Sequence, residues 1–300
     1  MSDTKRQSAK APEPIPSTDE ALDRLAMPLD TAMMTQRAIR RVLPDPVDDA
    51  VVLRCIELAL QAPTGNNGQQ WEFVVVKDRE IKRRLAKRYR QAWNLYARVA
   101  LRYLVRQDAS TARTVKAVQW QVDHFEEIPV LVIACLRLGV REGRVTGFRM
   151  PHPAESGYWG SIYPSVQNLL LAARAMGLGA SLTTMPLWNL TSARRILQLP
   201  ANVTPVCVVP IGWPRGRYGP SARRPVGEVT HLDGYGVRAW LQPLDATTAL
   251  DDSTRTSASQ ESTTTPEPGG EKYECTSPTS VTARTSISIS NRTLLGGDAT

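Results

Sequence analysis

The chain has 300 residues, of which 42% are hydrophobic and 22% charged, as in a globular protein with a sizeable core. It lacks a run of about 18 apolar residues, so we predict no membrane-spanning helix. The net charge of +8 comes without zinc-ligand spacing, an aromatic RNA-binding motif or basic repeats, which argues against a nucleic-acid-binding protein. The scattered cysteines and the polar, proline-containing N-terminus predict reduced thiols, no secretory signal and a cytoplasmic location.

Composition divides the chain into three parts. Residues 1–28 are polar and proline-containing, and residues 245–300 are dominated by serine and threonine with few large apolar side chains. Neither part can bury enough apolar surface to offset its ordering entropy, so we predict that both are disordered. The segment between them, residues 29–244, is predicted to form one folded domain.

The first half of this domain predicts a helix, a strand and a second helix. Asp45 is a candidate N-cap and Pro46 a candidate first helical residue for a helix that ends before Pro63. Residues 71–76 are aromatic and β-branched and predict a strand. Residues 79–106 contain apolar side chains at helical spacing, and many of the remaining residues are arginine or lysine. This pattern predicts a helix with one buried stripe and a solvated basic face.

The second half supplies the remaining strands. Residues 130–136 are apolar throughout and predict a strand in the interior of a covered sheet. Residues 161–176 predict an apolar helix that is closed by Gly177-Leu178-Gly179. Residues 206–212 predict a third strand, with Pro210 placing its end near a sheet edge. Because strands and helices do not alternate regularly, we predict an α+β fold and not a doubly wound sheet.

Two motifs in the first half suggest a ligand. The loop from Ala62 to Trp71 is rich in Asn and Gln, whose amides both donate and accept hydrogen bonds, as a flat heteroaromatic ligand such as a flavin requires. Upstream, Arg37 and Arg40 are three residues apart, and on one helical turn their guanidinium groups would hold a phosphate together. An ordinary turn and a solvated basic turn are the alternative interpretations of these two motifs.

Two further motifs follow the apolar helix. The small residues at 179–184 could offer main-chain N–H groups to a ring nitrogen or carbonyl, although a plain helix-to-strand connection has the same composition. Arg223 and Arg224 lie between prolines and could close on the same anion as the upstream arginines. We predict no metal site. The three histidines are far apart in sequence and are predicted to be structural: His124, His152 and His231.

The order and spacing of these four motifs resemble the FMN-dependent nitroreductase family, from about Met33 to Gly236. The sequence from Gly160 to Arg174 is most similar to actinobacterial-type members. The resemblance implies an α+β nitroreductase-like fold with a mixed, mostly antiparallel central sheet flanked by helices. It also implies an intertwined homodimer with FMN at the subunit interface.

The resemblance assigns the arginines to the phosphate of FMN. Arg37 and Arg40 would contact the phosphate and the ribityl chain, and Arg223 with Arg224 would complete the phosphate site. The chain departs from the family at this motif, because Gln precedes Arg37 and Ala38 follows it where Arg and Ser are common. One cation and one hydroxyl are therefore lost from the motif.

Other contacts follow from the same resemblance. Main-chain groups of Thr183 and Thr184 would donate near flavin N5 and O4. The residues that would line the ribityl chain and the pyrimidine edge are Pro63, Thr64, Asn67 and Gln69. The aromatic residues that would cap the ring, or would instead lie in the core, are Trp93, Tyr96, Trp120 and Phe125.

A bound flavin itself transfers hydride, so we predict no catalytic side chain. The predicted activity is a ping-pong reaction in which NAD(P)H, as co-substrate, reduces FMN, and an electron-poor acceptor such as a nitroaromatic or a quinone is then reduced. Alternatives within the family are ene reduction, dehalogenation and substrate oxidation. A flavin-binding sensor without turnover is an alternative of a different class.

Overall fold

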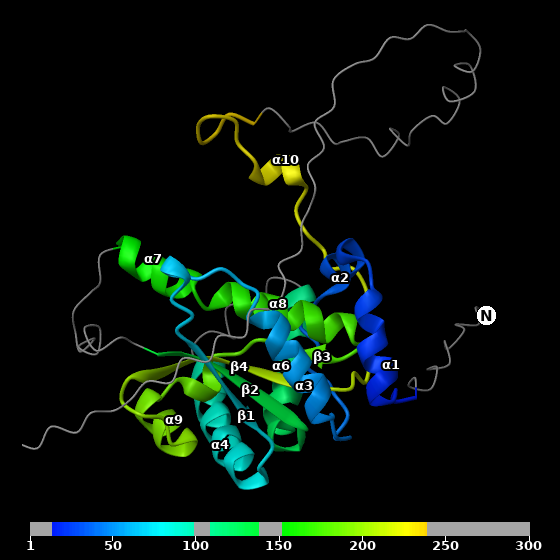
Figure 1. Cartoon of the computed structure of the whole chain (residues 1–300), viewed down its shortest axis with the longest axis vertical. Coiled ribbons are helices and arrows are strands. Elements are labelled where there is room, and N and C mark those ends of the chain that lie inside the picture. Colours follow the sequence, from blue (N-terminus) through cyan, green and yellow to red (C-terminus); the bar gives the residue numbers. More distant parts are fainter. Residues whose placement is uncertain (1–13, 99–108, 138–151, 239–300) are drawn as a thin grey trace, which may run out of the picture. The chain divides into compact units, whose positions relative to one another are not determined.

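The computed structural model describes residues 14–98, 109–137 and 152–238, which fall into two units that meet between Arg224 and Pro225 in the chain (Figure 1). The first unit contains a four-stranded sheet in the order β1-β2-β4-β3, with antiparallel neighbours throughout. The α+β prediction is confirmed, whereas the expected mixed sheet is entirely antiparallel among the described residues. The strands are β1 (Trp71–Val76), β2 (Val130–Arg137), β3 (Gly179–Ala180) and β4 (Val203–Gly212).

Helices cover both faces of this sheet. The helices of the first unit are α1 (Thr18–Asp23), α2 (Leu29–Thr35), α3 (Asp49–Ala59), α4 (Arg79–Tyr96), α6 (Ala109–Asp123), α7 (His152–Gly160), α8 (Tyr163–Ala175) and α9 (Leu190–Leu197). Short 3₁₀ turns are η1 (Arg24–Ala26), η2 (Gly65–Asn67), η4 (Phe125–Glu127) and η5 (Met185–Leu187). The second unit contains α10 (Val226–Val229), where the Arg238 guanidinium donates to the Glu228 carbonyl. In the described parts of the chain, every helix is too short or too polar to cross a membrane.

Strand β2 is buried on both faces because it lies between two cores. Its even-numbered residues from Val130 pack with α3 and α8, and its odd-numbered residues from Leu131 pack with α4 and α9. The alternation follows from the twofold period of a strand. The uninterrupted apolar run at 130–136 therefore predicted an interior strand correctly.

The buried thiols have no partner among the described cysteines, as a reduced state requires. Cys55, Cys135 and Cys207 are buried and free. Burial raises the pKa of each of these thiols to about 12, so none is a reactive thiolate at neutral pH.

Helix α3 begins three residues later than predicted. Asp48, not Asp45, is the N-cap, and its carboxylate accepts from the Ala50 N–H at 2.7 Å. The residues before Asp48 make other contacts and are not helical. Val47 is buried in the core, and the Pro46 carbonyl accepts from the Trp213 indole at 3.1 Å. The helix ends at Ala59 and so before Pro63, as predicted.

The position predicted for Pro210 was wrong, because β4 lies between β2 and β3 and not at an edge. Val208 exchanges both main-chain hydrogen bonds with Thr183, so the nitrogen of Pro210, two residues later, faces the same side. Proline has no N–H to donate there. The pairing of β3 with β4 is interrupted opposite this residue, at Ser181 and Leu182.

Part of the N-terminal segment is ordered, contrary to the prediction for residues 1–28. The Ser17 hydroxyl accepts from the Glu20 N–H, and the Glu20 carboxylate accepts from the Ser17 N–H at 2.8 Å, which is a capping box for α1. Ala21 is fully buried against the core. Residues 1–13 and the predicted tail at 245–300 lie outside the described residues.

Helix α8 is closed by glycine, as predicted. Gly177 has a φ of 85°, the Leu178 N–H donates to the Ala173 carbonyl and the Gly177 N–H donates to the Arg174 carbonyl. This is the hydrogen-bond pattern of a Schellman motif, in which a left-handed residue stops the helix.

A Gly177→Ala variant is expected to lose about 1–2 kcal/mol of unfolding free energy, because an L-residue is strained at this positive φ. The added Cβ would also lie 2.5 Å from the Arg24 guanidinium. Urea denaturation of the flavin-free protein measures the change. Gly157→Ala is the control, because Gly157 lies in α7 with no heavy atom within 4 Å of the added Cβ, and alanine favours a helix. Equal stability of the Gly177 variant and the wild type would contradict this account.

Candidate functional site

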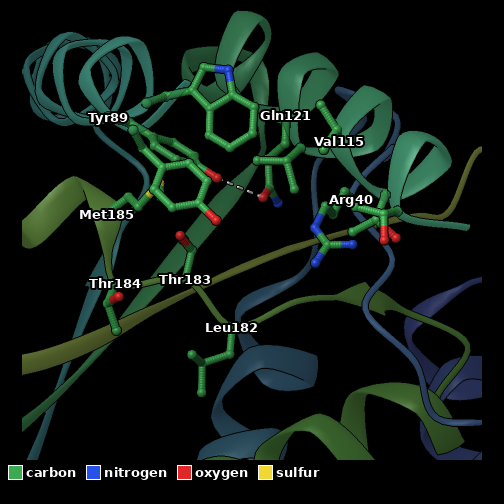
Figure 2. A pocket seen from close by; sticks show the side chains of 13 residues that line it. Arg40, Tyr89, Val115, Gln121, Leu182, Thr183, Thr184 and Met185 are labelled. Carbon is green, nitrogen blue, oxygen red and sulfur yellow. Dashed lines mark hydrogen bonds between the residues drawn. The ribbon is translucent and has the colours of Figure 1, made fainter. Parts of the chain in front are cut away.

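A cavity of about 430 Å³ lies between α4, α6 and the segment that follows β3 (Figure 2). Its volume falls in the range of small-molecule binding sites. The residues that line it come from all three elements and from the extended segment before α3: Arg40, Tyr89, Trp93, Tyr96, Thr111, Thr114, Val115, Val118, Gln121, Leu182, Thr183, Thr184 and Met185.

One wall of the cavity is largely apolar because of helical spacing. Tyr89, Trp93 and Tyr96 recur at four and three residues along α4, and α6 presents Val115 and Val118 in the same way. The Trp93 and Tyr96 rings are 5.8 Å apart. This wall offers flat and aliphatic surface to a ligand.

Polar groups also line the cavity, among them the side chains of Arg40, Tyr89 and Thr183 (Figure 2). Burial raises the pKa of the Tyr89 phenol, whereas a hydrogen bond with the Thr183 side chain and the positive charge of Arg40 lower it. Burial lowers the pKa of the Arg40 guanidinium, and Tyr89 opposes that shift. Arg40 is the only charged residue among the described residues that line the cavity, so its charge is available to a ligand.

Arg37 and Arg40 do not share a helical turn, and this part of the prediction was wrong. Residues 36–41 are not helical: Gln36 has an extended backbone, and the Ile39 N–H donates to the Ala180 carbonyl at 2.9 Å. Residues three apart on an extended chain point to opposite sides. Arg40 therefore lines the cavity, while Arg37 is exposed and its guanidinium approaches Gly219; Ala38 is also exposed.

The amide-rich loop does not reach this cavity either. Pro63, Asn67 and Gln69 are exposed, and the Gly65 N–H donates to the Ser161 hydroxyl at 3.1 Å next to α7. The loop is held internally, since the Thr64 hydroxyl accepts from the Gln69 N–H at 3.2 Å. Its shape uses left-handed backbone at three amide residues, which tolerate that region: Asn66, Asn67 and Gln69.

Arg223 and Arg224 are likewise exposed and line no part of the cavity. The Arg223 guanidinium donates to the carbonyl of its neighbour Ala222 at 3.0 Å. Among the described residues, the four predicted motifs therefore contribute Arg40, Leu182, Thr183 and Thr184 to this cavity within one chain.

Thr183 and Thr184 line the cavity, but the main-chain N–H of Thr183 is not free for a ligand as predicted. The Thr183 N–H donates to the Val208 carbonyl at 2.9 Å, so this main-chain donor is already used. The contact that Thr183 can offer a ligand is therefore its side chain.

The four predicted capping aromatics divide into two pairs. Trp93 and Tyr96 line the cavity, and that they cap a flavin ring stays a prediction. Phe125 is fully buried and packs edge-to-face on Tyr89 at 5.0 Å, and Trp120 stacks on His124 at 4.3 Å. Phe125 is thus a core residue, and Trp120 lies outside the cavity lining as the structure describes it.

Sequence reasoning missed Tyr89 and Gln121 as site residues, and it considered Ser181 only as part of the motif at 179–184. Gln121 and Ser181 are 1% exposed, and the Gln121 amide donates to the Ser181 hydroxyl at 2.8 Å. The available signal was a glutamine between Val118 and Val122 on an apolar helix face, which is costly unless it is hydrogen-bonded. In the ranges that the structure describes, no group of three or more His, Cys, Asp or Glu side chains could hold a metal ion.

Residues 33–213 match the model of the Nitroreductase family, so the chain belongs to this family of oxidoreductases. The match covers the sheet, the cavity and all helices from α3 to α9, and it confirms the resemblance inferred from the motifs.

Among curated proteins, the chain is 27% identical to iodotyrosine deiodinase of Danio rerio over 201 residues, which are 66% of this chain and 63% of that protein. It is 29% identical to 5,6-dimethylbenzimidazole synthase of Rhodospirillum rubrum over 206 residues, or 66% of this chain and 90% of the relative. The chain thus spans somewhat less than two thirds of the deiodinase that it matches.

Solved structures show the same fold. Oxidized iodotyrosine deiodinase bound to FMN and 3-iodo-L-tyrosine superimposes with a TM-score of 0.52 at 17% identity, over 70% of this chain and 100% of that chain. A BluB-like flavoprotein from Clostridium difficile 630 gives a TM-score of 0.52 at 19% identity, over 70% and 100% of the two chains. At these identities the likeness concerns the fold alone.

Proposed function

We propose that this protein is an FMN-dependent oxidoreductase that transfers hydride from NAD(P)H to an electron-poor acceptor such as a nitroaromatic or a quinone. The observation that carries the proposal is the cavity of a nitroreductase-family chain that is lined by Arg40, Thr183 and Thr184 and by no carboxylate among the described lining residues. FMN, when bound, supplies the centre that accepts and donates hydride. The two substrates would react in turn.

The residues of the cavity fit a flavin. An electron-rich ring edge would find a cation at Arg40 and hydroxyls at Thr183 and Thr184, while the wall of Trp93 and Tyr96 offers apolar surface to a flat ring. The protein would bind and orient the ring and exclude water from one side. The chemistry needs no further side chain.

We also propose a homodimer in which a second copy completes the site. Arg37, Arg223 and the loop at 63–69 are exposed and do not reach the cavity of their own chain. Large apolar side chains on α2 and α3 are exposed as well, as expected for a surface that a second copy covers. These are Leu29, Met33, Met34 and Leu53, with exposed fractions of 65%, 56%, 68% and 61%.

The purified protein is expected to be yellow and to release FMN, not FAD, on heating. The physical reason is that the predicted arginines suit one terminal phosphate, and the sequence has no Gly-x-Gly-x-x-Gly turn for a pyrophosphate. Chromatography of the released flavin measures this. Released FAD, or a protein that neither carries nor takes up FMN, would overturn the assignment.

Anaerobic addition of NADH and NADPH to the yellow protein separates an enzyme from a sensor. Bleaching of the flavin, followed by reoxidation with a panel of nitroaromatics and quinones, is expected for the enzyme. A flavin that neither nicotinamide reduces would instead support a flavin-binding sensor.

The relatives favour one alternative of the same class, namely another flavin reaction such as dehalogenation, substrate oxidation or ene reduction. They include an iodotyrosine deiodinase and a 5,6-dimethylbenzimidazole synthase. Iodide release from an iodophenol by the reduced protein, compared with the rate of nitroaromatic reduction, distinguishes these reactions. The cytoplasmic location, the actinobacterial subtype and the disordered tail at 245–300 remain predictions.

A further inference from the structure

A chain of buried polar groups lies beneath the cavity and joins three elements. The Tyr89 hydroxyl on α4 donates to the Gln121 side-chain carbonyl on α6 at 3.3 Å (Figure 2). The Gln121 amide donates to the Ser181 hydroxyl, just after β3, at 2.8 Å. All three residues are 1% exposed, and Tyr89 and Gln121 also line the cavity.

These contacts differ from the other buried polar contacts of the described chain. Lys82 and Ser165 donate to main-chain carbonyls, at Ile128 and Ile162, and each satisfies a neighbouring part of the backbone. Gln121 instead joins two side chains on other elements. An aliphatic residue at this position would pack without the cost of burying an amide, so helix packing alone does not require a glutamine.

The direction of the hydrogen bonds fixes how the phenol is presented. Because the single proton of the Tyr89 hydroxyl is given to Gln121, the phenol oxygen can only accept from other groups. Thr183 hydrogen-bonds to this oxygen, and the charge of Arg40 acts on it. Arg40 lines the same cavity, and no carboxylate is among the described lining residues, so nothing in that lining neutralises its positive charge.

We propose that Gln121 is a positioning residue that turns the Tyr89 oxygen toward Arg40 and thereby holds Arg40 as an uncompensated cation for a negatively charged oxygen of the ligand. The inference rests on the proposed function. The charged oxygen belongs to the ring of reduced FMN or to the nitro or quinone group of the acceptor. Both sources share one chemistry, and the experiment separates them.

The test is a double-mutant cycle of Gln121→Leu and Arg40→Ala in the full-length protein, with Tyr89→Phe as a second way to remove the phenol oxygen. Gln121→Leu and Tyr89→Phe are each expected to weaken ligand binding about two- to tenfold, as the loss of a neutral hydrogen bond does. In the Arg40→Ala background, the same substitutions are expected to change binding less than twofold, because Gln121 acts through Arg40.

Two readouts identify the source of the charged oxygen. The first readout concerns FMN and consists of the midpoint potential of bound FMN and the dissociation constant of FMN. The second concerns the acceptor and consists of KM and kcat, compared with each other, for a nitroaromatic and for a quinone. A shift confined to the first readout assigns the oxygen to FMN, and a shift in KM alone assigns it to the acceptor. Either result supports the positioning role.

Ser165→Ala is the matched control, since Ser165 is a buried polar residue on α8 in the other core. It is expected to change neither readout. Effects of Gln121→Leu that add fully to those of Arg40→Ala, or no effect of Gln121→Leu and Tyr89→Phe, would overturn the inference while leaving the proposed function intact. A wild-type protein that binds no FMN would overturn both.

Discussion

An Arg40→Ala variant is expected to bind FMN about ten- to a hundredfold more weakly than the wild type. Arg40 is the cation of the cavity lining, and loss of a charge-assisted hydrogen bond costs about 1.5–3 kcal/mol. Titration of FMN into the flavin-free protein, followed by quenching of FMN fluorescence, gives the dissociation constant. Fold stability without flavin is expected to change little.

Arg41→Ala is the matched control for this variant. Arg41 is the next residue on the same extended segment, its side chain is exposed, and its carbonyl accepts from the Arg215 N–H. Its substitution is expected to alter FMN binding by less than about twofold, because exposed charges contribute little. If Arg40→Ala bound FMN with wild-type affinity, the cavity would not be the flavin-binding site. If the homodimer forms, Arg37→Ala and Arg223→Ala are expected to weaken binding as Arg40→Ala does.

A Phe125→Ala variant is expected to lose about 3–5 kcal/mol of unfolding free energy, the cost of a large cavity in a core. Phe125 is fully buried and packs edge-to-face on Tyr89. Urea denaturation of the flavin-free protein measures the loss without a contribution from ligand binding.

Trp120→Ala is expected to lose less, since Trp120 is only half-buried and stacks on His124 outside the cavity. The comparison tests the division of the four aromatics. A Phe125→Ala protein of normal stability with a raised KM for the acceptor would instead show that Phe125 caps the flavin.

The parts of the fold that depend on local pattern were predicted well. The apolar run of β2 and the glycine that closes α8 each follow from residues close in sequence, and the structure confirms them. Arg37 and Arg40 were misplaced because their extended shape is set by pairing with Ala180, a residue far away in the chain. No local signal distinguishes that segment from a helical turn.

The cavity was predicted only in part for the same reason. It forms where α4 and α6 pack beside the segment after β3, so Tyr89 and Gln121 meet only in the folded chain. The motifs identified Thr183 and Thr184, because small residues after a helix are visible in the sequence. Residues that face the cavity from the middle of helices looked like ordinary core positions.

Pro210 has a consequence for the architecture of the cavity. In the register set by Ala180 with Ile211 and Thr183 with Val208, Ser181 stands opposite Pro210 and would take its hydrogen bond. Because proline has no N–H, that hydrogen bond is not made, and Ser181 and Leu182 do not pair with β4. Ser181 instead bonds with Gln121, and Leu182 lines the cavity. On its other side, Pro210 is opposite Leu131 of β2. The nitrogen of Pro210 points away from β2, so this pair needs no N–H from the proline and the pairing of β2 with β4 is not interrupted there. One missing N–H in the sheet thus leaves Ser181 free to bond with Gln121 and Leu182 free to line the cavity.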